Sequence, residues 1–448
     1  MGIIKILHIT PHLGGGVGSV LLNYLKRASS KKKYQIELIS LDCINNHATE
    51  KLNEIGVPYY ASQFNNFKKI NSKMAIADVV IIHWWNHPLL FNFLVKNQFP
   101  DVRIALWSHI SGFTLPNVFT KKLLLFPDIF VFTTPLSLKC SEVISTQSHE
   151  KFNYNIIWST GGVKRFSKAV PVVHPGFNIG YVGTVDYSKM HQECFSICSK
   201  INIPDVQFIF CGELGRGAVV SDVKQYSGKE HFIFEGLVED SVEFYQKFDV
   251  FGYPLAKHHY GTCDQVLAEA MAVGVVPVVM NNPMERLMVQ HEVTGIIAIN
   301  KNDYIFQIER LYKDPCLRKK LSENVKQYAS KRFSLTTMVA EWDQVIEALL
   351  LHSKKSRKWE LDKEVSGLSQ IDVYLEAMGN RKEAQYFKDY NMATSDTEKN
   401  KCIRKIKKEC STGNWQSSTK GTLHHYQLFF PEDKSLLQIQ TDLTTKET

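Results

Sequence analysis

Hydrophobic positions follow two alternating patterns over the first 350 residues of the chain. Short runs of β-branched and other apolar residues predict strands, and the longer stretches between them, with apolar residues three or four positions apart, predict helices. The first series of expected strands is Ile3–Ile9, Gln35–Ser40, Asp78–Ile82, Arg103–Trp107, Asp128–Phe132 and Asn155–Trp158. The second series is Ile179–Gly183, Val206–Cys211, His231–Phe234, Asp249–Tyr253, Val276–Met280 and Gly295–Ile299. Such alternation is typical of α/β proteins with parallel sheets.

A stretch of little periodicity separates the two series. It contains Gly161 and Gly162 and continues from Ala169 to Gly176, and it indicates a linker. We therefore expect two Rossmann-like domains, residues 1–170 and 171–351, with ligands bound at the carboxyl ends of their strands in a deep cleft. The helices Asp314–Phe333 and Leu335–Leu351 would close the second domain, and the last could lean back on the first.

The pattern of residues along the chain changes after His352. A basic run from Lys354 to Lys358 comes first, a helix is expected from Ile371 to Phe387, and a second basic stretch covers Lys401–Lys408. Residues 352–448 are interpreted as a C-terminal extension, either a small added domain or a partly ordered arm, of unknown role.

Composition limits the class of protein. The 448 residues are 44% hydrophobic and 22% charged, as in soluble globular proteins. The net charge of +8 could favour an anionic membrane surface or an anionic substrate, but it is no signature of nucleic-acid binding. Nine cysteines without a CxxC pair argue for reduced thiols and no metal site. Without a signal peptide or a membrane-length apolar run, a cytoplasmic protein is expected.

The most informative segment runs from Tyr260 to Pro277. A turn of small residues opens into a helix that carries one carboxylate, Glu269, and Gly274 ends that helix before an apolar strand. The N-terminus of a helix presents free N–H groups and a positive dipole end, so it can receive a phosphate. Glu269, two turns further on, could hold sugar hydroxyls. The alternative is an ordinary amphipathic helix with one satisfied carboxylate.

This segment resembles the donor-binding signature of retaining glycosyltransferases of family 4, which have the two-domain GT-B fold. The matching residues are Glu269, Ala270, Met271, Ala272, Gly274, Pro277, Val278 and Val279. The family pattern has a first glutamate eight residues before Glu269, where this chain has Gly261. The resemblance implies that Glu269 holds the nucleotide ribose, whereas the missing carboxylate would touch the transferred sugar. His258, His259, Thr262 and Asp264 are candidates to supply that contact.

A glycine-rich loop follows the first expected strand. Gly14 and Gly16 begin a dinucleotide fingerprint, but Ser19 occupies its last glycine position, which weakens an oxidoreductase interpretation. The resemblance implies that Gly15 and Gly16 face the donor diphosphate and the acceptor. The alternative is a tight turn needed only for packing.

Three histidines of the first domain are candidate site residues, His12 and His83 on the acceptor side and His109 as a catalytic residue. His12 lies on the glycine loop, and His83 and His109 end two expected strands, where an imidazole can donate to a sugar hydroxyl or a phosphate. A histidine after an apolar run is more often a packed core residue. The resemblance favours His109 as the residue that borders the reacting sugar.

Cations for the diphosphate are expected after the strand Ile179–Gly183. The resemblance implies that Gly183 and Lys189 contact the donor, but Thr184 stands where the family has an arginine, and Arg216 is a candidate replacement. Near Leu237 the family holds the nucleobase by backbone groups, so the sequence does not distinguish uridine from guanosine.

One further segment bears on location. Phe113 to Phe126 combines large apolar residues with Lys121 and Lys122. It could lie among lipid headgroups and recruit a lipid-linked acceptor, or it could be a helix half-buried in its own domain.

The resemblance implies a retaining, metal-independent glycosyltransferase with no cofactor beyond a UDP- or GDP-type sugar donor. Its acceptor would be a glycan or a lipid-linked molecule in cell-surface polysaccharide synthesis, and no nucleic acid is expected as a partner. The predicted catalytic residues are His109, Lys189 and Glu269. The alternatives are a GT-B phosphorylase or epimerase, and an inactive nucleotide-sugar-binding or scaffold subunit.

Overall fold

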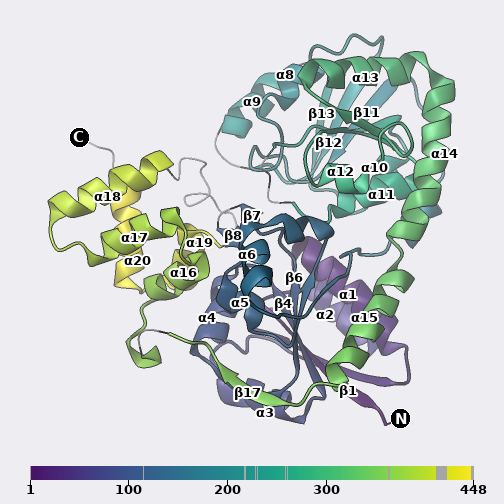
Figure 1. Cartoon of the computed structure of the whole chain (residues 1–448). Coiled ribbons are helices and arrows are strands. Elements are labelled where there is room, and N and C mark those ends of the chain that lie inside the picture. The colour runs from purple at the N-terminus through teal and green to yellow at the C-terminus, as the bar shows by residue number, and fades with distance from the viewer. Residues whose placement is uncertain are drawn as a thin grey trace. The chain divides into compact units, whose positions relative to one another are not determined.

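The chain folds into two compact units. The computed structural model describes residues 2–114, 116–215, 218–227, 229, 231–257, 259, 261–361, 364–409 and 421–444. Unit 1 consists of Met1–Ile157 and Val339–Thr448, and unit 2 of Trp158–Met338. Figure 1 shows the elements of both units, and each unit is described by itself below.

Unit 1 is built on a seven-stranded sheet in the order β10-β9-β6-β4-β1-β2-β3, with every neighbouring pair parallel. Its strands are β1 (Ile4–Thr10), β2 (Tyr34–Ser40), β3 (Tyr59–Tyr60), β4 (Val79–Trp84), β6 (Ile104–Ser108), β9 (Ile129–Phe132) and β10 (Tyr154–Ile156). The chain leaves β1 toward β2 on one side and later returns to β4 on the other. The loops after β1 and β4 therefore diverge, which is where ligands bind in such sheets.

Helices connect the strands of unit 1. They are α1 (Gly15–Ser29), α2 (Asn46–Ile55), α3 (Phe67–Ile76), α4 (Pro88–Lys96), α5 (Lys121–Leu125), the 3₁₀ turn η1 (Pro135–Lys139) and α6 (Ser141–His149). Asn45, Asn66 and Thr120 cap the helices that follow them by accepting backbone N–H groups. The starts of α2, α3 and α5 are thus set by local side-chain chemistry.

The segment from Phe113 to Phe126 is not a continuous helix. It forms a small antiparallel pair, β7 (Phe113–Thr114) and β8 (Asn117–Val118), followed by α5. Phe119, Leu123 and Leu124 are each 1% exposed within the core of unit 1. Their burial favours the packing interpretation of this segment over a membrane-facing one.

Unit 2 has a six-stranded parallel sheet in the order β13-β12-β11-β14-β15-β16. Its strands are β11 (Phe177–Val182), β12 (Val206–Cys211), β13 (Phe232–Gly236), β14 (Val250–Tyr253), β15 (Val276–Met280) and β16 (Ile296–Ala298). Its helices are α7 (Lys164–Ser167), α8 (Cys194–Cys198), α9 (Ala218–Ser227), α10 (Val242–Tyr245), α11 (Gln265–Val273), α12 (Glu285–Met288), α13 (Lys301–Lys313) and α14 (Pro315–Arg332). The loops after β11 and β14 diverge here, as those after β1 and β4 do in unit 1.

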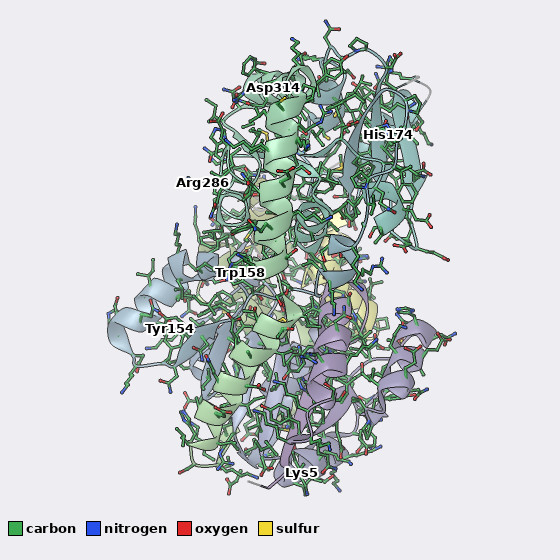
Figure 2. The ribbon with its side chains drawn as sticks, turned by 90° about the vertical axis from the view of Figure 1, so that its right-hand side faces the viewer. Lys5, Tyr154, Trp158, His174, Arg286 and Asp314 are labelled. Atoms are coloured by element: carbon green, nitrogen blue, oxygen red, sulfur yellow. The ribbon has the colours of Figure 1, made fainter. Side chains whose placement is uncertain are left out.

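The long helix α14 lies along unit 2 (Figure 2). Asp314 caps its first turn by accepting the backbone N–H of Leu317, and at its other end the Arg332 guanidinium lies 4.3 Å from the centroid of the Trp158 ring. The helix packs against α11 and β15, so it supports the helix that carries Glu269.

The C-terminal extension belongs to unit 1. The helix α15 (Leu335–Leu350) brings Trp342 against Tyr24 and Trp107 of unit 1. The strand β17 (Lys355–Lys358) then pairs antiparallel with β5 (Gln98–Val102). The remaining elements are η2 (Val365–Gly367), α16 (Gln370–Met378), α17 (Lys382–Met392), α18 (Asp396–Glu409), α19 (Leu423–Phe429) and α20 (Lys434–Thr444).

This arrangement differs from the domain boundaries expected from the sequence. The chain enters unit 2 at Trp158, before the expected linker, and residues from Val339 onward pack with unit 1. The basic run became a strand because Arg357 and Lys355 reach the buried Asp128 carboxylate, at 3.0 and 3.2 Å. Those ion pairs and the apolar contacts of Trp359 depend on residues more than 200 positions away, which local patterns do not reveal.

Candidate functional site

The loops after β11 and β14 of unit 2 bring several predicted residues together. Gly183 and Lys189 follow β11, and the turn that opens α11 follows β14. Gly183 has a φ of +135°, and a Cβ built on it would lie 3.0 Å from the Lys189 ammonium nitrogen. The Lys189 ammonium therefore lies directly beside bare glycine backbone, an arrangement that suits a phosphate group.

Lys189 is paired with a carboxylate at the start of α11. The Lys189 Nζ lies 3.5 Å from Asp264 Oδ2, which also accepts a hydrogen bond of 2.8 Å from the Tyr253 hydroxyl. The Lys189 and Asp264 side chains are only 11% and 7% exposed. Asp264 is the N-cap residue of α11, so its carboxylate and the Lys189 ammonium both lie at the positive end of the helix dipole.

Glu269 is buried on α11. Gln265 Nε2 donates to one of its carboxylate oxygens at 3.1 Å, and the Tyr245 hydroxyl donates to the other at 3.3 Å. Burial raises the pKa of Glu269 to about 7, although these two hydrogen bonds act in the opposite direction. Glu269 is thus a carboxyl group that can gain or lose a proton near neutral pH.

Three buried polar atoms in this region have no hydrogen-bond partner within the described residues. They are Thr262 Oγ1, Gln265 Oε1 and Glu285 Oε2. Buried polar atoms are nearly always hydrogen-bonded, so these three atoms are candidates to meet polar groups of a ligand. Sequence reasoning identified Thr262 but missed Gln265 and Glu285, because neither stands at a position that the family pattern marks.

His259 orients Glu285. The backbone N–H of Gly261 donates to His259 Nδ1 at 3.0 Å, which leaves the ring proton on Nε2. His259 Nε2 lies 2.8 Å from Glu285 Oε1, and both side chains are at most 3% exposed. A carboxylate held in this way stands near Gly261, the position that lacks the family glutamate.

The other predicted donor residues of unit 2 are placed less distinctively. The Leu237 side chain is 82% exposed, next to Gly236 at the end of β13. Thr184 is exposed beside Gly183. Arg216 and His258 lie outside the described residues.

In unit 1 the glycine loop follows β1. Gly15 and Gly16 begin α1, are exposed, and have open space where a Cβ would stand. A Cβ on Gly18 would lie only 1.9 Å from the carbonyl oxygen of Leu13. Gly18 therefore serves packing, whereas Gly15 and Gly16 leave the backbone open to a ligand. His12 accepts the N–H of Gly14 at 2.9 Å, which holds the loop in shape.

Two of the predicted histidines of unit 1, His83 and His109, form a row of three with His8. His8 Nδ1 lies 2.9 Å from His83 Nε2, and His83 Nδ1 lies 3.1 Å from His109 Nε2. His83 is fully buried and uses both ring nitrogens on other histidines, so its side chain is not presented to an acceptor. Sequence reasoning missed His8 because it lies in the middle of a buried strand.

The extension reaches the loop after β4. The His425 and Phe429 rings of α19 lie 5.0 and 4.7 Å from the His87 ring, and the Tyr426 hydroxyl donates to Asn86 Oδ1 at 3.3 Å. His87 in turn lies 5.4 Å from His12. The structure thus places the C-terminal residues beside the glycine loop of unit 1, which the sequence did not indicate.

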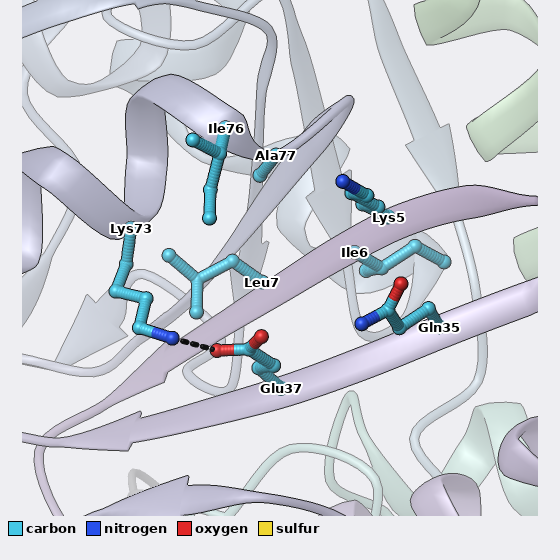
Figure 3. A pocket seen from close by; sticks show the side chains of 8 residues that line it. All are labelled: Lys5, Ile6, Leu7, Gln35, Glu37, Lys73, Ile76 and Ala77. Carbon is cyan, nitrogen blue, oxygen red and sulfur yellow. Dashed lines mark hydrogen bonds and ion pairs between the residues drawn. The ribbon is translucent and has the colours of Figure 1, made fainter.

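One small pocket lies elsewhere in unit 1 (Figure 3). It is lined by Lys5, Ile6, Leu7, Gln35, Glu37, Lys73, Ile76 and Ala77. The Lys73 ammonium forms a 2.8 Å ion pair with Glu37 inside it. The pocket borders the first half of β1, away from the glycine loop, and contains none of the predicted site residues.

Two searches of the described residues were negative. No group of three or more His, Cys, Asp or Glu side chains there is arranged to hold a metal ion. Within the same residues, no helix is long and apolar enough to cross a membrane.

Each unit has a parallel sheet with diverging loops, and these two sheets define the class of fold. The structure is similar to that of HepE from Anabaena in complex with UDP, with 14% identity and a TM-score of 0.60 over 77% of this chain and 100% of that one. A glycosyltransferase from Rickettsia africae is similar at 14% identity and a TM-score of 0.61, over 79% and 100% of the two chains. Sucrose-phosphate synthase from Thermosynechococcus elongatus matches at 16% identity and 0.59, over 77% and 99%. The chain has the GT-B fold.

The sequence of unit 2 is more specific. Residues 164–329 match the family described as Glycosyl transferases group 1. This range lies within unit 2 and contains Lys189, Asp264 and Glu269. The chain therefore carries a group 1 glycosyltransferase domain, and the predicted GT-B fold is confirmed.

Proposed function

We propose that the protein is a retaining glycosyltransferase of family 4 that transfers a sugar from a nucleotide-sugar donor to a glycan or lipid-linked acceptor. The observation that carries the proposal is the grouping of Gly183, Lys189, Asp264 and Glu269 where the loops after β11 and β14 diverge. This grouping supplies a cation, glycine backbone, a helix N-terminus and a buried carboxyl group, the parts that a nucleoside diphosphate requires.

Each part has a role in the proposed reaction. Lys189 and the N-terminus of α11 stabilise the charge of the departing diphosphate, and Glu269 accepts hydrogen bonds from the ribose hydroxyls. A leaving phosphate oxygen takes the proton of the attacking hydroxyl on the same face of the sugar, so that the anomeric configuration is retained. No metal ion or organic cofactor is required in this scheme, and His109 of unit 1 contacts the sugar.

The donor is proposed to be a UDP- or GDP-sugar. Structures of HepE are known in complex with UDP and with UDP-glucose, which supports a uridine nucleotide as the first to test. The polar atoms left without partners at Thr262, Gln265 and Glu285 are proposed to meet the sugar hydroxyls in place of the absent glutamate at Gly261. We further propose a cytoplasmic protein of cell-surface polysaccharide synthesis that can meet an anionic membrane surface.

One observation favours a second candidate function. Gly261 lacks the family carboxylate, and the Lys189 ammonium is already paired with Asp264. A nucleotide-sugar-binding subunit without catalysis would keep the nucleotide contacts and lose turnover.

Thermal unfolding with UDP, GDP, ADP and their sugar conjugates tests the proposal, because a ligand of the folded state raises the melting temperature. We expect one nucleotide to stabilise the wild type and to lose most of this effect with Glu269→Ala, whereas Glu323→Ala on the exposed face of α14 behaves as wild type. Incubation of that donor with candidate acceptors should yield a product of retained configuration by NMR. Stabilisation without transfer or hydrolysis favours the binding subunit, and no stabilisation by any nucleotide contradicts both candidates.

A further inference from the structure

His8, His83 and His109 form a hydrogen-bonded row in unit 1. The burial of its His8 end determines which ring nitrogens of the row carry protons. The three residues come from β1, β4 and the residue after β6, neighbouring strands of the sheet. The rings of His83 and His109 are nearly parallel, at 6°, with centroids 5.4 Å apart, and those of His8 and His83 are 28° and 5.2 Å apart. Two hydrogen bonds connect the three rings, one between His8 Nδ1 and His83 Nε2 and one between His83 Nδ1 and His109 Nε2.

Burial keeps the rings of His8 and His83 neutral. His8 and His83 are fully buried, and burial lowers the pKa of His8 to about 3 and that of His83 well below its usual range. The surrounding side chains are Tyr24 of α1 and Trp107 of β6, whose rings lie 5.4 Å from His8 and 5.2 Å from His83. Burial and the negative charge of Asp343 raise the pKa of Tyr24, so this tyrosine stays protonated.

A neutral row can carry its protons in two ways. Either every ring donates toward His109, from Nδ1 of His8 to Nε2 of His83 and from Nδ1 of His83 to Nε2 of His109, or every ring donates in the opposite direction. The second arrangement puts a proton on His8 Nε2, which is buried without a hydrogen-bond partner in the described part of the chain. Orphaned buried N–H groups are rarer than orphaned acceptors, so the first arrangement is favoured.

We propose that His83 is a positioning residue that fixes the tautomer of His109, with Nε2 as acceptor and the proton on Nδ1. His109 then acts on a ligand as a hydrogen-bond donor to an oxygen atom and is kept from serving as a general base through Nε2. The role in transfer rests on the proposed function, whereas the tautomer does not.

The first test is NMR of protein with ¹⁵N-labelled histidine, in which the protonated and unprotonated ring nitrogens of His109 are distinguished and its signals are identified by their loss in His109→Gln. The wild type should show a protonated Nδ1 and an unprotonated Nε2 at His109. With His83→Phe this preference should be lost, because the hydrogen bond from His83 Nδ1 to His109 Nε2 is gone. A protonated Nε2 in the wild type overturns the proposal.

The matched control is His8→Phe, the same substitution in the same row at a residue that does not contact His109. Its loss leaves His83 Nε2 as the orphaned end, and the rule that disfavours a buried N–H again keeps the His83 proton on Nδ1. His8→Phe should therefore retain the His109 tautomer. Equal loss of the tautomer in both variants would mean that general core packing, and not His83, sets it.

Kinetics provide the second readout. Once a donor is identified, His83→Phe should lower kcat roughly 10- to 100-fold, with the donor KM within about threefold, since misplacement of a group at the sugar costs rate more than affinity. His8→Phe should keep kcat within about threefold. His83→Asn, whose amide can donate in place of Nδ1–H, should recover most of the rate if it melts like the wild type. Unchanged kcat in His83→Phe overturns the positioning role, and a protein with the expected tautomer but no transfer refutes only the proposed function.

Discussion

At the scale of single residues, the candidate donor site contains a buried carboxyl group and an ammonium group that is already paired with a carboxylate. Burial raises the pKa of Glu269 to about 7, and Asp264 holds the Lys189 ammonium at 3.5 Å. Desolvation of Glu269 destabilises its charged form, and the ion pair with Asp264 neutralises Lys189 in the unliganded protein. Ribose hydroxyls could donate hydrogen bonds to Glu269, and a diphosphate could pair with Lys189.

Glu269→Gln should change how stability depends on pH. A carboxyl whose pKa is raised from 4.5 to about 7 on folding stabilises the folded state at low pH, and this contribution is lost as the pH rises through 7. Relative to the wild type, the variant should gain up to about 3 kcal/mol in unfolding free energy between pH 4 and pH 8. Urea unfolding at both pH values measures this difference. A parallel pH dependence in the two proteins would show that Glu269 is not desolvated in solution.

Lys189→Ala should weaken binding of a nucleoside diphosphate about tenfold while affecting the nucleoside little, because the ammonium acts on the phosphates. Titration calorimetry with the nucleotide selected by thermal unfolding measures both affinities. Lys200→Ala, an exposed lysine of the same unit, is the control and should bind like the wild type. An equal loss for nucleoside and diphosphate would place Lys189 away from the phosphates.

At the scale of elements, helix N-termini and glycine loops determine what each sheet edge can receive. The helix α1 begins with two exposed glycines and packs through a third, Gly18, whose Cα lies against the carbonyl of Leu13. The helix α11 begins at Asp264 and ends at Gly274, which adopts a φ of +100°. Both helices start where loops diverge, so their amide groups are available at the predicted ligand sites.

Gly18→Ala should destabilise unit 1 by about 1–3 kcal/mol, since its Cβ would lie 1.9 Å from a backbone oxygen and the helix must shift. Gly16→Ala in the same helix meets open space and should leave stability unchanged or raise it by up to about 1 kcal/mol. Chemical denaturation of the two variants gives the comparison. A tolerated Gly18→Ala would mean that the loop before α1 can move without loss.

At the scale of the whole molecule, the extension is part of unit 1 and not an appendage. Its helices contribute Ile371, Tyr374, Phe387, Tyr426 and Leu436 to the same hydrophobic core as the β1 and β4 strands. The first residues of the extension are held to unit 1 by the pairing of β17 with β5 and by ion pairs to Asp128. Through α19 the extension also lines the loop after β4, so its loss would alter the acceptor side of the proposed enzyme.

Leu436→Ala should therefore lower the stability of unit 1 by about 2–5 kcal/mol, because the side chain is fully buried in that shared core. Its neighbour Leu437 is 49% exposed, and Leu437→Ala should change stability by less than about 0.5 kcal/mol. Hydrogen exchange should accelerate in β1 and β4 with Leu436→Ala while β11 and β14 keep their protection. Unchanged exchange in β1 and β4 would show that the extension folds separately.

The strand prediction depended on local patterns and agreed closely with the structure. Val206–Cys211 and Val276–Met280 are strands with the predicted bounds, and the other expected strands differ by one or two residues at their ends. Buried parallel strands read as continuous apolar runs, which a single sequence reveals. The short strands β3, β5, β7, β8 and β17 were missed. In β17, three of the four residues are cationic, and the segment becomes a strand only by pairing with β5.

Site residues, too, were predicted where a local pattern marked them and were missed where none did. Lys189, Asp264 and Glu269 were predicted from the family resemblance and from their positions beside strand ends, and their assignment to the site stays a prediction. The Lys189–Asp264 pair and the contacts with Tyr253 and Tyr245 came from the structure. His8 and Glu285 carried no local signal, because a polar residue in or after an apolar strand looks the same whether it is packed or functional.

The sequence alone determined the order of the longer strands of both sheets, the glycine turns that begin α1 and end α11, and the resemblance to a GT-B glycosyltransferase. These properties depend on residues close together in the chain, where hydrophobic periodicity and backbone preference act directly. Only the tertiary structure decided that the extension joins unit 1, that His83 links two other histidines, and that Lys189 faces Asp264. Each of these depends on contacts between residues brought together by folding, and no local pattern encodes which distant partner a buried charge or imidazole will meet.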